Sequence, residues 1–243
     1  MGLFDLLRKK NKQNRPRCAA VVPAAGSATR MEGQDKVLSL LADWPVLIHT
    51  LRALQGSSLI DEIIVVTRGD LIVPVGQLCK DYALSKVTKV IVGGSTRTQS
   101  VLVGIIEVAE GTQLIAIHDG ARPLVPPEVI DEVILRAAEC SAAAPAVPVK
   151  DTIKRGSGGF VEATLERDTL FAIQTPQVFD ADLILGALKK AEEDGVLLTD
   201  DCAAVERIGM TVALTKGSYE NIKITTPVDL ILAEAILQER NGL

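Results

Sequence analysis

The sequence has few of the residues that build metal centres or disulfide frameworks. Its 243 residues include only two histidines and four cysteines. The cysteines Cys18, Cys79, Cys140 and Cys202 are widely spaced, and no Cys-x-x-Cys pair occurs. This pattern argues against a zinc site and against disulfide cross-links. We therefore expect free thiols and a reducing, cytoplasmic location.

The chain also lacks long hydrophobic runs and an excess of positive charge. No apolar stretch approaches the roughly 18–20 residues that a membrane-spanning helix needs. The first 17 residues carry six cations and one anion, but the whole chain has a net charge of −5, so the remainder carries −10. Such a body is a poor partner for nucleic acid. We expect residues 1–17 to form a flexible basic tail without stable membrane association, followed by one domain, 18–243.

The segment after the first expected strand matches neither of two well-known phosphate-binding motifs. A strand-like apolar run ends in Pro23-Ala-Ala-Gly-Ser-Ala-Thr-Arg-Met31. A P-loop needs glycine where Met31 stands, and the dinucleotide fingerprint needs glycine where Ala28 stands. The segment still offers small residues that expose backbone N–H groups, with Arg30 and Lys36 as nearby cations. Taken alone, it is equally compatible with phosphate binding and with an ordinary strand-to-helix turn.

Strand-length apolar runs alternate with helical stretches along most of the chain. This alternation predicts right-handed crossovers and a mostly parallel sheet. The expected strands are 18–22, 62–67, 87–92, 114–118, 142–149, 172–175 and 211–215. The expected helices are 46–54, 95–110, 127–140, 181–194, 200–208 and 227–240.

The pattern changes after Val149. The segments 150–155 and 160–165 have the composition of two short strands, and Gly156-Ser-Gly-Gly159 joins them as a turn. Because a hairpin has no obvious place in a parallel sheet, we expect a protruding arm at about 149–167. Exposed hairpins commonly find partner strands in another subunit. The predicted fold is a single Rossmann-like, three-layer α/β domain with a mostly parallel sheet and this β-hairpin arm.

Unusual polar residues follow several of the expected strands. Ligands of open parallel sheets bind beyond the carboxyl ends of the strands, so these residues point to one cleft. Asp119 is either a helix or turn cap or a metal and ribose contact, and Arg122 either pairs with Asp119 or touches substrate. We expect His118 to be packed and hydrogen-bonded rather than a general base. The residues of the predicted cleft are Gly26, Arg30, Lys36, Gly93, Gly94, Ser100, His118, Asp119, Arg122, Asp151 and Thr152.

Taken in order, the motifs of this chain resemble those of the 2-C-methyl-D-erythritol 4-phosphate cytidylyltransferases of the non-mevalonate isoprenoid pathway. The resemblance runs from about Cys18 to the C-terminus, and the ordered set is more specific than any single piece. The motifs are Pro23-Ala-Ala-Gly26, Gly93-Gly94 with Arg97 and Ser100, His118-Asp-Gly-Ala-Arg-Pro123, Pro148-Val-Lys-Asp-Thr-Ile-Lys154, Arg167-Asp168, Gln174-Thr-Pro-Gln177, Thr199-Asp200 and Asn221-Ile-Lys-Ile-Thr225.

The resemblance implies a homodimeric enzyme that transfers CMP from CTP to 2-C-methyl-D-erythritol 4-phosphate with Mg²⁺. It implies arms that carry Thr152 and Arg167 into the partner's active site. The catalytic residues would be Arg30, Lys36, Arg167 and Lys223, with Asp119 near the metal. The nucleotide would contact Pro23, Ala24, Ala25, Gly26, Gly94, Ser100, Asp119, Gly120 and Arg122. The sugar phosphate would contact Thr152, Arg167, Thr175, Thr199 and Lys223.

The first loop, Pro23 to Met31, and the residues beside Lys36 depart from the family pattern at four positions. The family usually has glycine at Ala28, a basic residue at Thr29, and Pro-Lys-Gln where this chain has Asp35-Lys-Val37. The change at Thr29 removes a cation that would attract phosphate. Asp35 adds a negative charge next to Lys36. These departures bear on nucleotide affinity more than on the reaction itself.

Two alternative functions stay open on sequence alone. A ribitol-5-phosphate cytidylyltransferase looks similar along much of the chain, although Pro23-Ala-Ala-Gly26 and Asp151-Thr-Ile-Lys-Arg155 fit the methylerythritol enzymes better. A non-catalytic nucleotide-binding protein of the same fold is the second alternative, because of the departures in the first loop.

Overall fold

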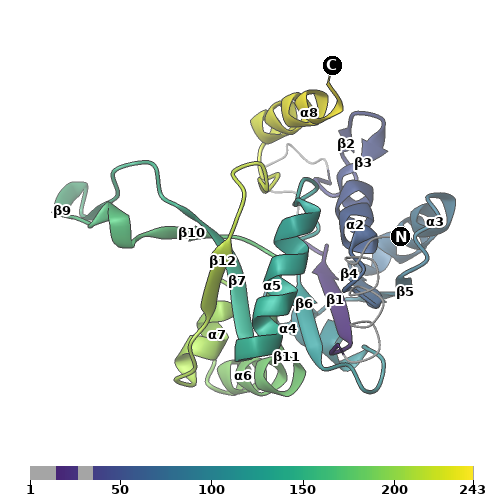
Figure 1. Cartoon of the computed structure of the whole chain (residues 1–243), viewed down its shortest axis with the longest axis horizontal. Helices are drawn as coiled ribbons and strands as arrows, with labels where there is room; N and C mark the ends of the chain where they lie inside the picture. Colours follow the sequence, from purple (N-terminus) through teal and green to yellow (C-terminus); the bar gives the residue numbers. More distant parts are fainter. Residues whose placement is uncertain (1–14, 27–34, 243) are drawn as a thin grey trace, which may run out of the picture.

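The fold is seen in a computed structural model that describes residues 15–26 and 35–242 (Figure 1). Eight strands form its main sheet. They are β1 (Cys18–Pro23), β4 (Glu62–Thr67), β5 (Val87–Val92), β6 (Leu114–Ile117), β7 (Ala142–Pro148), β10 (Phe171–Ile173), β11 (Gln177–Asp180) and β12 (Ala213–Lys216). Their order is β10-β7-β11-β6-β1-β4-β5, and β12 also pairs with β7. β10 and β11 are antiparallel to their neighbours and the other pairs are parallel, as the alternating pattern predicted.

Side chains along each strand alternate between the two faces of the sheet, and each face carries a buried core. Cys18, Ala20 and Val22 pack into one buried cluster, whereas Ala19 and Val21 pack into the other. Successive side chains of a strand point to opposite faces, so a strand with helices on both sides is apolar throughout. The helices are α2 (Val46–Gly56), α3 (Ile72–Asp81), α4 (Arg97–Ile106), α5 (Pro127–Cys140), α6 (Ala181–Glu193), α7 (Cys202–Arg207) and α8 (Pro227–Asn241). The first cluster contains residues of α2, α3 and α5, and the second contains residues of α4, α6 and α7, so the three-layer prediction is confirmed.

Some elements were missed by the sequence patterns. α3 carries Pro74 and Gly76, two residues with low helix propensity that hide its periodicity. β11 is only four residues long and follows Pro176. The short strands β2 (Leu40–Leu41) and β3 (Trp44–Pro45) are also too brief to predict. By contrast, β4, β5 and α5 have the predicted bounds.

The hairpin after β7 forms a two-stranded antiparallel sheet of its own, apart from the main sheet. It consists of β8 (Lys154–Ser157) and β9 (Phe160–Thr164), and Figure 1 shows it extending away from the rest of the molecule. Gly158 and Gly159 have φ angles of +59° and +85°, which glycine adopts without steric cost. The predicted turn 156–159 was therefore too long, because the first two residues belong to β8.

The basic tail lies mostly outside the described residues, which begin at Arg15. The Arg15 guanidinium donates to the Asp61 carboxylate at 2.7 Å. The backbone N–H of Arg17 donates to the Gln113 side chain at 3.2 Å. The chain is thus attached to the domain from Arg15 onward. Among the described helices, none combines the length and apolar character needed to cross a bilayer.

Candidate active site

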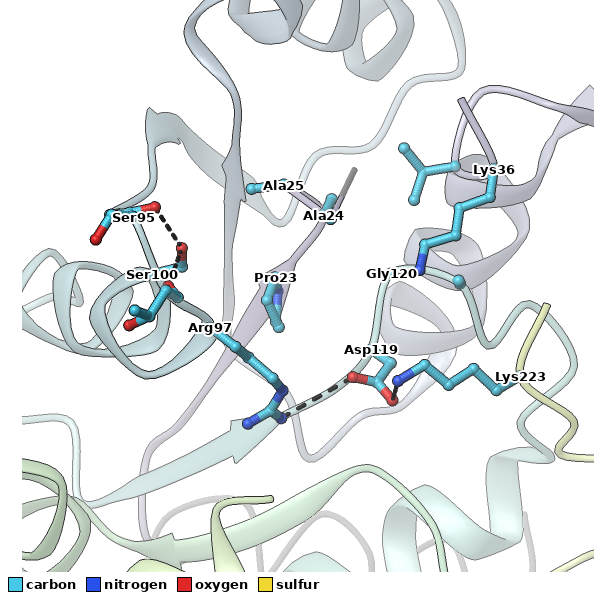
Figure 2. A pocket seen from close by; sticks show the side chains of 15 residues that line it. Pro23, Ala24, Ala25, Lys36, Ser95, Arg97, Ser100, Asp119, Gly120 and Lys223 are labelled. Atoms are coloured by element: carbon cyan, nitrogen blue, oxygen red, sulfur yellow. Dashed lines mark hydrogen bonds and ion pairs between the residues drawn. The ribbon is translucent and has the colours of Figure 1, made fainter. Parts of the chain in front are cut away.

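A cavity of about 410 Å³ lies beyond the carboxyl ends of β1, β5 and β6 (Figure 2). This is the edge of a parallel sheet where ligand sites are expected. The predicted site residues that line the cavity are Pro23, Ala24, Ala25, Gly26, Lys36, Gly94, Ser100, Asp119, Gly120 and Lys223. Val37, Ser95, Thr96, Arg97 and Ala121 complete the lining. The structure therefore brings together segments from four distant parts of the chain.

The backbone at Gly26 and the side chain of Lys36 lie next to each other in the cavity. The backbone N–H of Ala24 donates to the carbonyl of Val66 at 2.7 Å, which fixes the start of the loop on β4. A Cβ atom placed on Gly26 would stand 3.5 Å from Nζ of Lys36, so the ammonium group lies directly over the glycine backbone. Arg30, like Ala28 and Thr29, lies outside the described residues.

Close packing at Gly93 and Gly94 places the beginning of α4 against the cavity. A Cβ atom on Gly93 would stand only 2.6 Å from Oγ of Ser100, so glycine is needed for this approach. The Thr96 hydroxyl caps α4 by accepting the backbone N–H of Gln99 at 3.1 Å. The Ser100 hydroxyl donates to the carbonyl of Thr96 at 2.9 Å.

Asp119 is surrounded by positive charge. Nζ of Lys223 is 2.9 Å from its carboxylate, Nε of Arg122 is 3.5 Å away and a guanidinium nitrogen of Arg97 is 3.9 Å away. Burial alone would raise the pKa of Asp119, but Lys223, Arg97 and Arg122 together lower it to about 2. The carboxylate is therefore ionised at neutral pH. Figure 2 shows Arg97 and Lys223 approaching it from two sides.

Arg97 also forms a two-pronged ion pair with a buried carboxylate. Its two terminal nitrogens donate to the oxygens of Asp201 at 2.9 and 2.6 Å, and the Asp201 side chain is only 1% exposed. The Gln177 side-chain oxygen accepts the backbone N–H groups of Asp201 and Cys202. Its amide nitrogen donates to Asp200 at 2.9 Å. Burial would lower the pKa of Arg97, but Asp201 holds it above its ordinary value.

Sequence reasoning did not assign Arg97, Asp201 or Gln177 to the site. Arg97 and Gln177 lie inside motifs of the family resemblance, and Asp201 directly follows one, so their proximity to predicted site residues was the available signal. The pairing itself joins residues 104 positions apart, and no local pattern encodes it.

His118 is a structural residue, as predicted. It is fully buried, and Nδ1 lies 3.0 Å from the Thr175 hydroxyl, which accepts the backbone N–H of Asp119. The Thr175 proton is then donated to Nδ1, so Nε2 carries the ring proton and donates to the carbonyl of Arg122 at 3.2 Å. Burial lowers the pKa of His118 to about 4, which keeps the ring neutral.

The remaining predicted residues do not line the cavity. Thr175 is buried behind it, and Arg122 donates to the carbonyl of Asn221 at 2.6 Å. Thr152, Arg167 and Thr199 are exposed. Arg167 makes a 3.4 Å hydrogen bond to the carbonyl of Lys150 at the base of the arm. Within one chain, the residues predicted to contact the sugar phosphate are therefore spread over the cavity, its back wall, the arm and the loop between α6 and α7.

Among the described residues that line the cavity, Asp119 supplies the one ionised carboxylate that a metal ion could use. Within the described residues, no group of three or more histidine, cysteine, aspartate or glutamate side chains could hold a metal. Magnesium often uses one or two protein carboxylates and takes its other ligands from substrate phosphates and water. Asp119 fits a metal ion that arrives together with a nucleotide.

Comparisons with known proteins agree on one family. The sequence pattern of the family described as IspD, 2-C-methyl-D-erythritol 4-phosphate cytidylyltransferase, matches residues 18–239. A 2-C-methyl-D-erythritol 4-phosphate cytidylyltransferase of Desulforamulus reducens is 46% identical over 225 residues, which cover 91% of this chain and 96% of the relative. One from Dehalococcoides mccartyi is 45% identical over 221 residues, with 90% and 96% covered. The crystal structure of 4-diphosphocytidyl-2C-methyl-D-erythritol synthase from Anaerococcus prevotii superposes with a TM-score of 0.82 at 31% identity, covering 92% and 96% of the two chains.

Proposed function

The chain belongs to the 2-C-methyl-D-erythritol 4-phosphate cytidylyltransferase family, and we propose that it transfers CMP from CTP to 2-C-methyl-D-erythritol 4-phosphate. The products are 4-diphosphocytidyl-2-C-methyl-D-erythritol and pyrophosphate, within non-mevalonate isoprenoid biosynthesis. The observation that carries the proposal is the cavity that gathers residues 23–26, Lys36, Asp119 and Lys223 at one sheet edge.

In this proposal the cavity binds the nucleotide. Small residues of the first loop expose backbone N–H groups to the triphosphate. Lys36 and Lys223 line the cavity and supply positive charge, and the family resemblance assigns Arg30 the same role. The nucleoside contacts the segments at Gly94 to Ser100 and at Asp119 to Arg122.

The reaction needs no protein nucleophile. A phosphate-monoester oxygen of the sugar phosphate attacks the α-phosphorus of CTP, the bond to the bridging oxygen breaks, and pyrophosphate leaves with that electron pair. Because both reactants are anions, catalysis consists of holding them together and stabilising charge in the transition state. Lys36 and Arg30 face the oxygens of the α-phosphate in this scheme. The neutral, fully bonded His118 has no proton to exchange at the site.

Asp119 would hold Mg²⁺ together with the phosphates of CTP. When bound, the ion neutralises phosphate charge and orients the phosphates relative to each other. In the structure the Asp119 carboxylate is paired with Lys223 at 2.9 Å. In this proposal, Lys223 would share the carboxylate with the metal ion.

The acceptor side of the site is proposed to form across a homodimer. Thr152 and Arg167 lie exposed at the arm of about 149–167, so they are available to a second chain. Thr175, Thr199 and Lys223 would contact the same sugar phosphate from within the chain. The described cysteines are all free, which fits a reducing cytoplasm.

A pyrophosphate-release assay tests the proposal. We expect release with CTP and 2-C-methyl-D-erythritol 4-phosphate in the presence of Mg²⁺. Preferential release with D-ribitol 5-phosphate would instead identify the ribitol-type enzyme. CTP binding without release in either reaction would identify a non-catalytic nucleotide-binding protein.

A further inference from the structure

Asp35, the acidic residue next to Lys36, is paired with a cation from another part of the chain. A guanidinium nitrogen of Arg68 lies 2.7 Å from the Asp35 carboxylate, whose side chain is 14% exposed. Arg68 directly follows β4. The negative charge that distinguishes this chain from the family pattern is therefore compensated by a residue at the carboxyl end of the neighbouring strand.

The same strand end holds the other described flank of the first loop. The carbonyl of Val66 accepts the backbone N–H of Ala24 at 2.7 Å, and the Thr67 hydroxyl donates to the carbonyl of Ala24 at 3.4 Å. Ala24 and Asp35 lie on either side of residues 27–34, which are outside the described part. Both flanks of that segment are thus attached to β4 and the residue after it.

Asp35 in turn fixes the backbone around Lys36. Its carboxylate accepts the backbone N–H of Val37 at 3.3 Å, and its carbonyl accepts that of Leu38 at 2.9 Å. Lys36 lies within this turn, and its side chain extends over Gly26, which also lines the cavity. A displacement of Asp35 would therefore move the ammonium group of Lys36.

We propose that Arg68 is a positioning residue for the transfer reaction. Through its ion pair with Asp35, it holds Lys36 at the cavity. The inference rests on the proposed function, because Lys36 is the group that acts on the nucleotide.

Arg68 has a second partner that provides a matched control. It donates two hydrogen bonds of 3.1 Å to the Asp70 carboxylate, whose side chain is 65% exposed. Asp70 does not line the cavity. Asp70→Ala therefore removes a partner of Arg68 without touching the contact to Asp35.

The test compares Arg68→Ala, Arg68→Lys, Asp70→Ala, Lys36→Ala and the double variant Arg68→Ala/Lys36→Ala. We expect kcat and the affinity for CTP to fall by about tenfold in Arg68→Ala, since small displacements of a catalytic group are costly. Arg68→Lys should recover part of the loss, and Asp70→Ala should stay within about twofold of the wild type. The double variant should match Lys36→Ala, because Arg68 acts through Lys36.

Arg68→Ala behaving like Asp70→Ala would overturn the inference, as would losses that multiply in the double variant. Measuring the affinity for CTP by calorimetry separates a failure of the role proposed for Arg68 from a failure of the proposed function. A chain that binds CTP without releasing pyrophosphate contradicts the proposed function, while the affinities of the same variants still decide the role of Arg68. A chain that binds no CTP overturns both.

Discussion

The cavity and the arm differ in how their residues are held. In the cavity, Asp119 and Ser100 are nearly buried and each has partners within the chain. On the arm, Phe160 is 80% and Val161 66% exposed, and β8 and β9 pair only with each other. One chain can therefore preorganise the proposed nucleotide pocket alone. The arm, by contrast, presents an apolar surface that fits the proposed contact with a second chain.

The root of the arm is nevertheless fixed. The Tyr219 hydroxyl donates to the carbonyl of Pro148 at 2.7 Å, and the ammonium group of Lys150 lies 3.5 Å from the Tyr219 ring centre. Tyr219 precedes Lys223 in the same loop. The arm therefore leaves the domain next to a segment that also lines the cavity.

The largest expected effect tests the cavity side of the comparison. Lys36→Ala should lower kcat by roughly 10²–10³, or about 2.7–4 kcal/mol, because a preorganised cation at the transition state is lost. Single-turnover kinetics with CTP and the sugar phosphate would measure this. Lys189→Ala, at an exposed position of α6, is the control. Near-normal turnover in Lys36→Ala would remove this lysine from the mechanism.

The second prediction concerns the buried support of the cavity. Asp201→Ala should lower the free energy of unfolding by about 3 kcal/mol, because it leaves the Arg97 guanidinium without its main partner in a partly buried place. Urea denaturation measures the loss. Asp194→Ala, which removes two surface ion pairs, one with Lys190 of α6 and one with Arg207 of α7, should change stability little. Equal losses of unfolding free energy in the two variants would contradict a larger contribution from the buried pair.

A third prediction uses pH. His118 has a pKa of about 4 in the folded protein against about 6.5 when unfolded, so unfolding takes up a proton between these values. Stability should therefore fall as the pH drops through this window, with His118 contributing about 2 kcal/mol of loss at pH 5. Urea denaturation at pH 7 and 5 would show a smaller loss in His118→Gln. His49, whose pKa burial also lowers, remains in both proteins. An unchanged pH dependence would contradict a neutral buried His118.

The smallest expected effect tests the arm. Arg167→Ala should raise KM for the sugar phosphate by about tenfold, the value of one charge-assisted contact, and leave KM for CTP within about twofold. Steady-state kinetics with each substrate varied in turn would measure both constants. Similar increases for the two substrates would argue against a sugar-phosphate role.

Hybrid dimers would test which chain's active site Arg167 serves. In a hybrid of Lys36→Ala and Arg167→Ala chains, an arm that acts in the partner's site leaves one of the two sites with both residues intact. Co-expressed chains, assayed below KM for the sugar phosphate, should therefore be more active than either variant alone. Activity no higher than the mean of the two variants would place Arg167 in its own chain's site.

The strands and most helices could be predicted because their signals are local. Apolar runs of strand length define β4 and β5, and Pro127 begins α5 as a first-turn proline does. The antiparallel strand β11 could not be predicted, because four residues between β7 and β6 take their conformation from the partners on both sides. The cleft could be predicted because parallel strands deliver their carboxyl ends to one edge.

Hydrophobic periodicity and ordered motifs were enough to predict the α/β architecture, the family and the segments that meet at the cavity. The matching of charges, in contrast, was set by the fold. The pairs of Arg97 with Asp201 and of Arg68 with Asp35 join separate parts of the chain, and burial with neighbouring charge sets the ionisation of Asp119 and His118. Such effects depend on distances and on exclusion of water, which no local run of residues encodes.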